Sequence, residues 1–255
     1  MNTNNSEQLN AAAKAGDIDL LYTVIRNDPS IFERIDSIPF VETPLHISAS
    51  MGHLQFAIEI MRLKPSFALK LNEQGFSPIH LAMQNGHMTM VSRFVKINKE
   101  LVRVQGREGI TPLHYASQIG EVELLADFLF ACPDSIEDVT ARDETALHIA
   151  VKNEQFEALQ VLVGWLKANY EKGARKLELK ILNQKDEAGN NILHISVLGK
   201  EPQTQLLVKT SINLNAKNLE NKTALDIATT SEIKKLLSSS RAKSGSQVSD
   251  THTCA

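Results

Sequence analysis

The motif Thr111-Pro112-Leu113-His114 is the most informative feature of this chain, because copies of it recur along most of the sequence. Two close copies precede it, at Thr43-Pro44-Leu45-His46 and Ser77-Pro78-Ile79-His80, and three looser copies begin at residues 145, 191 and 223. The first residues of successive copies lie 34, 34, 34, 46 and 32 positions apart. Five of the eight histidines occupy the fourth position of a copy. Such self-similarity at a nearly constant spacing indicates a repeat protein.

Each position of the motif suits the start of a helix. The Thr or Ser hydroxyl can cap the first turn, and a proline at the first helical position lacks only an N–H that the helix would not use. Gly52, Gly86 and Gly120 lie nine residues after the capping position, where a left-handed residue ends a helix without strain. A second segment with helical apolar spacing follows, as in Leu54–Leu63. The pattern therefore predicts a helix, a tight turn and a second helix in each unit.

A second turn site lies two residues before each capping position. It holds residue types that tolerate positive φ: Gly75, Gly109, Asp143, Gly189 and Asn221. We expect a projecting β-turn, here called a finger, at each of these sites, and an irregular first finger because Val41 occupies its turn position. The repeated histidines are expected to bridge turn backbone groups and the Thr of their own unit.

The motif and its period resemble the ankyrin repeat. The resemblance implies an all-α fold, a solenoid of stacked helix-turn-helix units with β-turn fingers. It divides the chain into a degenerate N-terminal capping repeat over 7–42 and six repeats over 43–237, which start at 43, 77, 111, 145, 191 and 223. Residues 1–6 and the polar tail 238–255 are expected to be disordered, since the tail has few apolar residues and no period.

Pro29, Pro65 and Pro133 lie where the second helix of a unit should end. This feature resembles plant ankyrin proteins that carry a C-terminal domain of membrane helices, face the cytosol and act in defence and stress signalling. No stretch of 18 apolar residues occurs in this chain, so we expect no membrane span in it. The expected location is the cytoplasm, or the cytosolic face of a membrane if a longer form exists.

The interval from Thr145 to Asn191 is about a dozen residues longer than the others, with the excess near 163–182. We expect a lengthened second helix and a solvated loop there, because insertions in repeat proteins map to the surface. The alternative is a partner contact that uses Trp165, Tyr170 and the neighbouring basic residues.

Composition and motifs argue against several function classes. A formal net charge of −3 does not favour nucleic acid as a partner. Phosphate-binding loops, zinc-protease motifs and nucleophile elbows are absent from the sequence. We therefore predict no catalytic residues, no metal site, no cofactor and no enzyme activity, and we expect a monomer.

Binding to another protein is the function that the repeats favour. Stacked repeats offer an extended concave groove, formed by the finger tips and the outer ends of the first helices. We predict that a protein partner contacts these ten residues: Gln74, Phe76, Gln84, Asn85, Arg107, Ile110, Gln118, Arg142, Lys152 and Asn153. The predicted function is a non-catalytic interaction scaffold in plant defence or stress signalling. The alternative is the cytosolic part of a membrane-anchored signalling or transport-regulating protein.

Overall fold

The computed structural model describes residues 3–168 and 174–248, and within these ranges it contains helices and turns but no strand. The chain divides into two compact units. The first comprises Met1–Tyr115 and Asp127–Ser135, and the second comprises Ala116–Ala126 and Ile136–Ala255. The division passes through α8 (Pro112–Ile119), α9 (Val122–Ala131) and the short 3₁₀ helix η4 (Pro133–Glu137).

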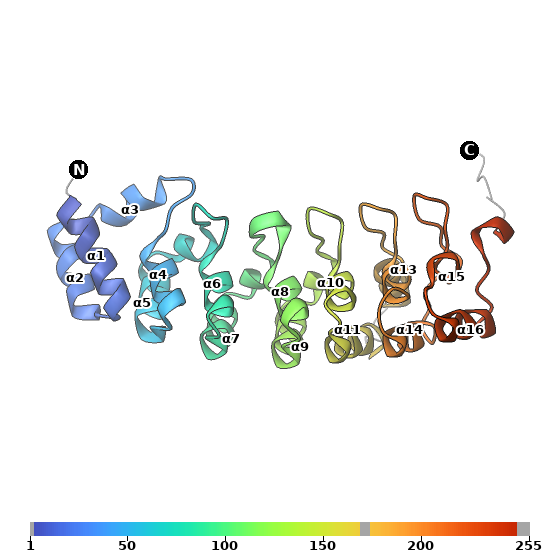
Figure 1. Ribbon diagram of the computed structural model, residues 1–255. Helices are drawn as coiled ribbons and strands as arrows, with labels where there is room; N and C mark the ends of the chain where they lie inside the picture. The colour runs from blue at the N-terminus through green and yellow to red at the C-terminus, as the bar shows by residue number, and fades with distance from the viewer. Residues whose placement is uncertain (1–2, 169–173, 249–255) are drawn as a thin grey trace. The chain divides into compact units, whose positions relative to one another are not determined.

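In the first unit, the first helices of successive repeats pack on one another in chain order, α1 on α4 and α4 on α6. Each also packs against the second helix of its own repeat, and the fingers extend beyond the ends of the first helices (Figure 1). The elements are α1 (Thr3–Ala15), α2 (Ile18–Asn27), α3 (Ile31–Asp36), α4 (Pro44–Met51), α5 (Leu54–Leu63), η1 (Pro65–Leu69), α6 (Pro78–Gln84), α7 (Met88–Ile97), η2 (Lys99–Arg103) and η3 (Arg107–Gly109).

The second unit repeats this arrangement, with α10, α13 and α15 packed in order and α14 between α11 and α16. Its elements are α10 (Ala146–Lys152), α11 (Phe156–Ala168), α12 (Ala174–Leu182), α13 (Ile192–Ser196), α14 (Glu201–Leu207), α15 (Ala224–Ile227), α16 (Ser231–Ser239) and η5 (Gly245–Gln247). The predicted all-α, helix-turn-helix repeat fold is confirmed.

The repeated histidine joins a first helix to the finger of the next repeat. The Thr43 hydroxyl caps α4, and the backbone N–H of Thr43 donates to Nδ1 of His46 at 3.1 Å. Nδ1 is therefore the acceptor, and the protonated Nε2 donates to the carbonyl of Phe76 at 3.0 Å. Burial lowers the pKa of His46 to about 4, so the ring is neutral. His80 and His148 make the same bridge, with pKa values also lowered to about 4 by burial.

The predicted turn positions have positive φ. All five finger residues do so, with φ from 59° at Asp143 to 83° at Gly75. The first finger is irregular, as expected: φ is not positive at Val41, and the adjacent Phe40 pairs with Leu71 as an isolated parallel bridge. The glycines that end the first helices are left-handed too, as at Gly52.

The structure corrects the expected loop in the insertion. α11 is three residues longer than α5, as predicted, but residues 174–182 form an additional helix, α12. Ile181 and Leu182 are buried at the positions that Phe67 and Ala68 occupy in an earlier repeat. Burial of these apolar side chains stabilises the packed helix relative to a solvated loop. Trp165 is half-buried, and Tyr170 lies outside the described residues.

The expected disorder at both ends is also corrected. Residues 3–6 belong to α1, in which Asn5 is buried. At the other end, residues 240–248 fold back onto the last repeat. The Gly245 amide donates to Asp226 Oδ2 at 2.7 Å, and the Thr223 hydroxyl donates to the Lys243 carbonyl at 2.8 Å. Asp226 occupies the histidine position of the motif, and its carboxylate accepts from an amide where a neutral histidine would donate to a carbonyl. The expectation for 249–255 concerns residues outside those described.

Candidate partner-binding surface

A side chain closes the base of four fingers, whereas Gly106 holds the equivalent position in the finger that carries Arg107. Asn72 Oδ1 accepts from the backbone N–H of Gln74 at 3.1 Å and of Phe76 at 2.9 Å. Thr140, Asp186 and Asn218 make the same pair of bonds in later fingers. Sequence reasoning missed these residues, although they recur at the intervals of the main motif. Their hydrogen bonds hold the finger backbone in one conformation and so position the exposed side chains at its tip.

In the first unit the structure brings together two of the predicted fingers. A Cβ added to Gly75 would lie 3.3 Å from Cβ of Arg107, so the fingers of Gln74 and Arg107 are in contact. Gln74 and Arg107 are exposed, whereas Phe76 and Ile110 are half-buried. The carbonyls of these two half-buried residues accept from His46 and His80. Phe76 and Ile110 are therefore anchored to the scaffold and offer only part of their side chains to a partner.

Gln84 and Asn85 lie at the C-terminal end of α6, and both are exposed. The Asn85 side-chain amide donates to the Leu81 carbonyl at 2.8 Å and to the Ser50 hydroxyl at 3.3 Å. Asn153 makes the same bond to the Ile149 carbonyl at 2.8 Å in the second unit. Because these amides cap the ends of first helices, Gln84 is the more available of the two neighbouring side chains.

A small recess of about 110 Å³ adjoins the finger that carries Gln74. Its lining consists of Glu42, Asn72, Glu73 and Gln74. The two glutamates were not among the predicted contacts. Their exposed carboxylates give this part of the finger surface a negative character, while Arg107 contributes a positive charge on the neighbouring finger. The predicted surface of the first unit is therefore mixed in charge.

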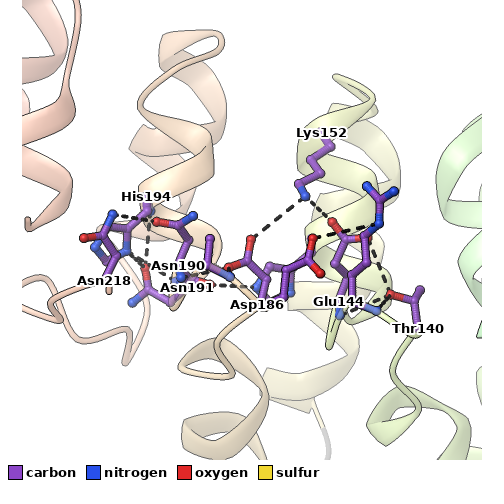
Figure 2. A network of polar contacts seen from close by, with 12 residues as sticks. Thr140, Glu144, Lys152, Asp186, Asn190, Asn191, His194 and Asn218 are labelled. Atoms are coloured by element: carbon purple, nitrogen blue, oxygen red, sulfur yellow. Dashed lines mark hydrogen bonds and ion pairs between the residues drawn. The ribbon is translucent and has the colours of Figure 1, made fainter. Parts of the chain in front are cut away.

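In the second unit Lys152 is tied to two fingers. Figure 2 shows its side chain extending from α10 toward Glu144 and Asp186. The ammonium is hydrogen-bonded to the Glu144 carboxylate and lies 3.9 Å from Asp186 Oδ2. Glu144 is only 7% exposed and Asp186 only 8%. A half-exposed lysine thus compensates two nearly buried carboxylates, which would be costly to leave without a counter-charge.

The fingers of the second unit are also joined to one another. The Glu187 amide donates to the Arg142 carbonyl at 3.0 Å, and the Leu219 amide donates to the Ala188 carbonyl at 3.1 Å. The Arg142 guanidinium lies 3.9 Å from the Glu187 carboxylate, with both side chains largely exposed. Arg142 and Gln118 are both exposed, so they remain open to a partner, whereas the charge of Lys152 is already engaged.

Residues 3–168 and 174–248 contain no group of three or more His, Cys, Asp or Glu side chains arranged to hold a metal ion. Over the same ranges, no helix is long and apolar enough to cross a membrane.

Comparisons with known proteins agree with this fold. The family model for ankyrin repeats matches residues 9–102 and 90–176. The chain is 46% identical over 244 residues to ankyrin repeat-containing protein BDA1 of Arabidopsis thaliana, which covers 92% of the chain and 57% of that protein. It is also 33% identical over 95 residues to a transient receptor potential cation channel subfamily A member 1 homologue of Caenorhabditis elegans, over 37% of the chain and 7% of the channel. The chain thus spans little more than half the length of the plant relative.

Solved structures share the architecture at low sequence identity. An ankyrin repeat domain from Acinetobacter baumannii superposes with a TM-score of 0.65 at 22% identity, covering 78% of this chain and 98% of that one. The human ASB11 ankyrin repeat domain superposes with a TM-score of 0.62 at 18% identity, covering 91% and 96%. The repeated motif, the helix-turn-helix units and these matches show that the chain belongs to the ankyrin-repeat family, whose repeats are scaffolds for protein–protein interaction.

Proposed function

We propose that this chain is a non-catalytic scaffold that binds a partner protein through its concave groove, the finger tips and the outer ends of its first helices. The observation that carries the proposal is the contrast between a rigid base and an exposed tip. The finger of Gln74 is held by Asn72 and by the His46 bridge, and the finger of Arg107 by the His80 bridge. Gln74, Gln84 and Arg107 stay exposed. Preorganised polar and arginine side chains suit protein recognition because little entropy is lost on binding.

The test compares two triple variants of the full chain as baits for affinity capture and mass spectrometry. The finger variant carries Gln74→Ala, Gln84→Ala and Arg107→Glu, which alter exposed side chains and spare the structural ties of Asn85 and Lys152. The matched control carries Gln55→Ala, Thr89→Ala and Arg93→Glu, all exposed on α5 and α7.

The free energy of unfolding of both variants should lie within about 1 kcal/mol of the wild-type value, because substitutions of exposed residues change stability little. We expect the proteins captured by the wild type and the control to be lost from the finger variant. Capture of the same proteins by all three baits would contradict a partner site on the fingers.

The proposed setting is plant defence or stress signalling in the cytoplasm. The 46% identity to the Arabidopsis relative supports a plant setting. We also propose an alternative, the cytosolic part of a membrane-anchored signalling or transport-regulating protein, because the chain spans only 57% of that relative. Full-length transcript sequencing distinguishes the two, since a membrane-anchored form requires several apolar segments of about 20 residues downstream of the repeats. Pathogen growth on plants that lack the gene would test the defence role.

A further inference from the structure

An aromatic side chain is exposed on α9 at a position where the two preceding repeats carry a cation. Phe130 is 90% exposed. The residue 34 positions earlier is Lys96, and the residue 34 positions before that is Arg62. Leaving a phenylalanine in water forgoes the favourable free energy of burying its ring. An exposed aromatic side chain that borders an apolar hollow forms the kind of contiguous surface that association covers.

A hollow lies beside Phe130, between α7 and α9 of the first unit. Its volume is about 290 Å³, and apolar atoms of Val95, Phe128 and Ala131 form much of its lining. This volume lies at the lower end of the range for small-molecule sites, about 300–1,000 Å³, and is ample for one large side chain. The hollow therefore has room for a side chain of a protein partner.

The two walls of the hollow carry opposite charges. Lys96 and Lys99 lie on the wall formed by α7 and η2, and Asp127 lies on the wall formed by α9. Within the described part of the chain, none of the three takes part in an ion pair. We call Lys96, Lys99, Asp127, Phe130 and the hollow between them the Phe130 patch. A ligand of a single charge sign would leave one wall of the patch unmatched.

We propose that the Phe130 patch is a self-association interface, occupied by a second copy of this chain. A twofold axis along the groove places α7 of one copy opposite α9 of the other. Each Asp127 then faces the lysines of the other copy, and each Phe130 enters the other hollow beside Lys96, where a cation–π contact is available. The patch is thus complementary to itself in both charge and shape.

This interface leaves the fingers available. In the first unit, the second helices lie away from the finger tips (Figure 1), so self-association and partner binding use different residues. Two copies would present two sets of fingers, and a partner with two binding motifs would then gain avidity. The proposal replaces the monomer expected from the sequence, and one measurement distinguishes the two.

The test is sedimentation velocity of the full chain over a range of concentrations. We expect the mass to rise from 28.2 kDa toward twice that value, with Phe130→Ala lowering the association constant at least tenfold. Asp127→Lys alone, and Lys96→Asp with Lys99→Asp, should each abolish association by placing like charges opposite one another. An equimolar mixture of these two charge variants should associate again, because the swapped charges match across the interface.

Glu123→Lys provides a matched control, since it makes the same charge change at another exposed position of α9. This control should associate as the wild type does. A wild-type chain that sediments at 28.2 kDa at every concentration would overturn the proposal and leave the patch to a foreign protein. Association that survives both Phe130→Ala and Asp127→Lys, or charge variants that do not associate when mixed, would overturn it equally.

Discussion

Gly52→Ala should destabilise this protein more than Gly86→Ala, although both glycines end a first helix with nearly the same backbone. Their φ values are 78° and 76°. An alanine in this left-handed region costs about 1 kcal/mol of stability. Alanine also lowers the conformational entropy of the unfolded chain, and the resulting stabilisation is the same at both sites. The two sites differ in their surroundings. A Cβ at Gly52 would lie 2.6 Å from Cε1 of His87, whereas a Cβ at Gly86 meets no atom within 4 Å.

The clash at Gly52 should displace the His87 ring, whose Nε2 donates to the Ser50 carbonyl at 3.0 Å. Losing that hydrogen bond costs about 1 kcal/mol in addition to the backbone strain. We therefore expect losses of about 1 kcal/mol for Gly86→Ala and about 2–3 kcal/mol for Gly52→Ala. Urea unfolding at neutral pH, with m values held equal, measures both.

A double-mutant cycle isolates the contact between repeats. In a His87→Ala background no ring remains to clash, so Gly52→Ala should cost only the strain of about 1 kcal/mol. Equal losses of stability for the two glycine variants in the wild-type background would contradict a clash with His87. So would a cost of Gly52→Ala that does not change when His87 is removed.

Three further predictions concern buried polar groups. Burial lowers the pKa of His46, His80 and His148 to about 4, so these rings stay neutral in the folded chain but protonate near pH 6.5 when it unfolds. The free energy of unfolding should therefore fall as the pH drops from about 6.5 to 4, by at most about 1.4 kcal/mol per pH unit for each histidine. Urea midpoints that stay level across this pH range would disprove the prediction. Gln203→Leu should stabilise the chain by about 1 kcal/mol in the same assay, because Gln203 is 2% exposed and neither side-chain polar atom has a partner within the described structure; a lower midpoint would show that the amide is needed. Lys152→Met should cost about 1–2 kcal/mol, since Glu144 and Asp186 lose their counter-charge, and an unchanged thermal melt would show that solvent already compensates them.

Much of the fold could be predicted because its determinants are local. The capping Thr43, the left-handed Gly52 and the bridging His46 act within one repeat or between equivalent positions of adjacent repeats, so periodic spacing reveals them. The base of the finger was equally periodic, as Asn72 shows, and the prediction missed it only because its residue type varies. The candidate partner residues were placed on exposed fingers and helix ends, and whether a partner contacts them stays a prediction.

The caps and turns of the repeats could be predicted from residue type at a fixed spacing, because each of them depends on local backbone geometry. Packing in three dimensions determines three other features: the Lys152 charge is engaged, Ile181 and Leu182 anchor α12 to the core, and Phe130 lies beside an open hollow. Each of these depends on side chains from two repeats at once. No periodic rule states which pairs meet, since the pairing depends on packing between non-equivalent residues.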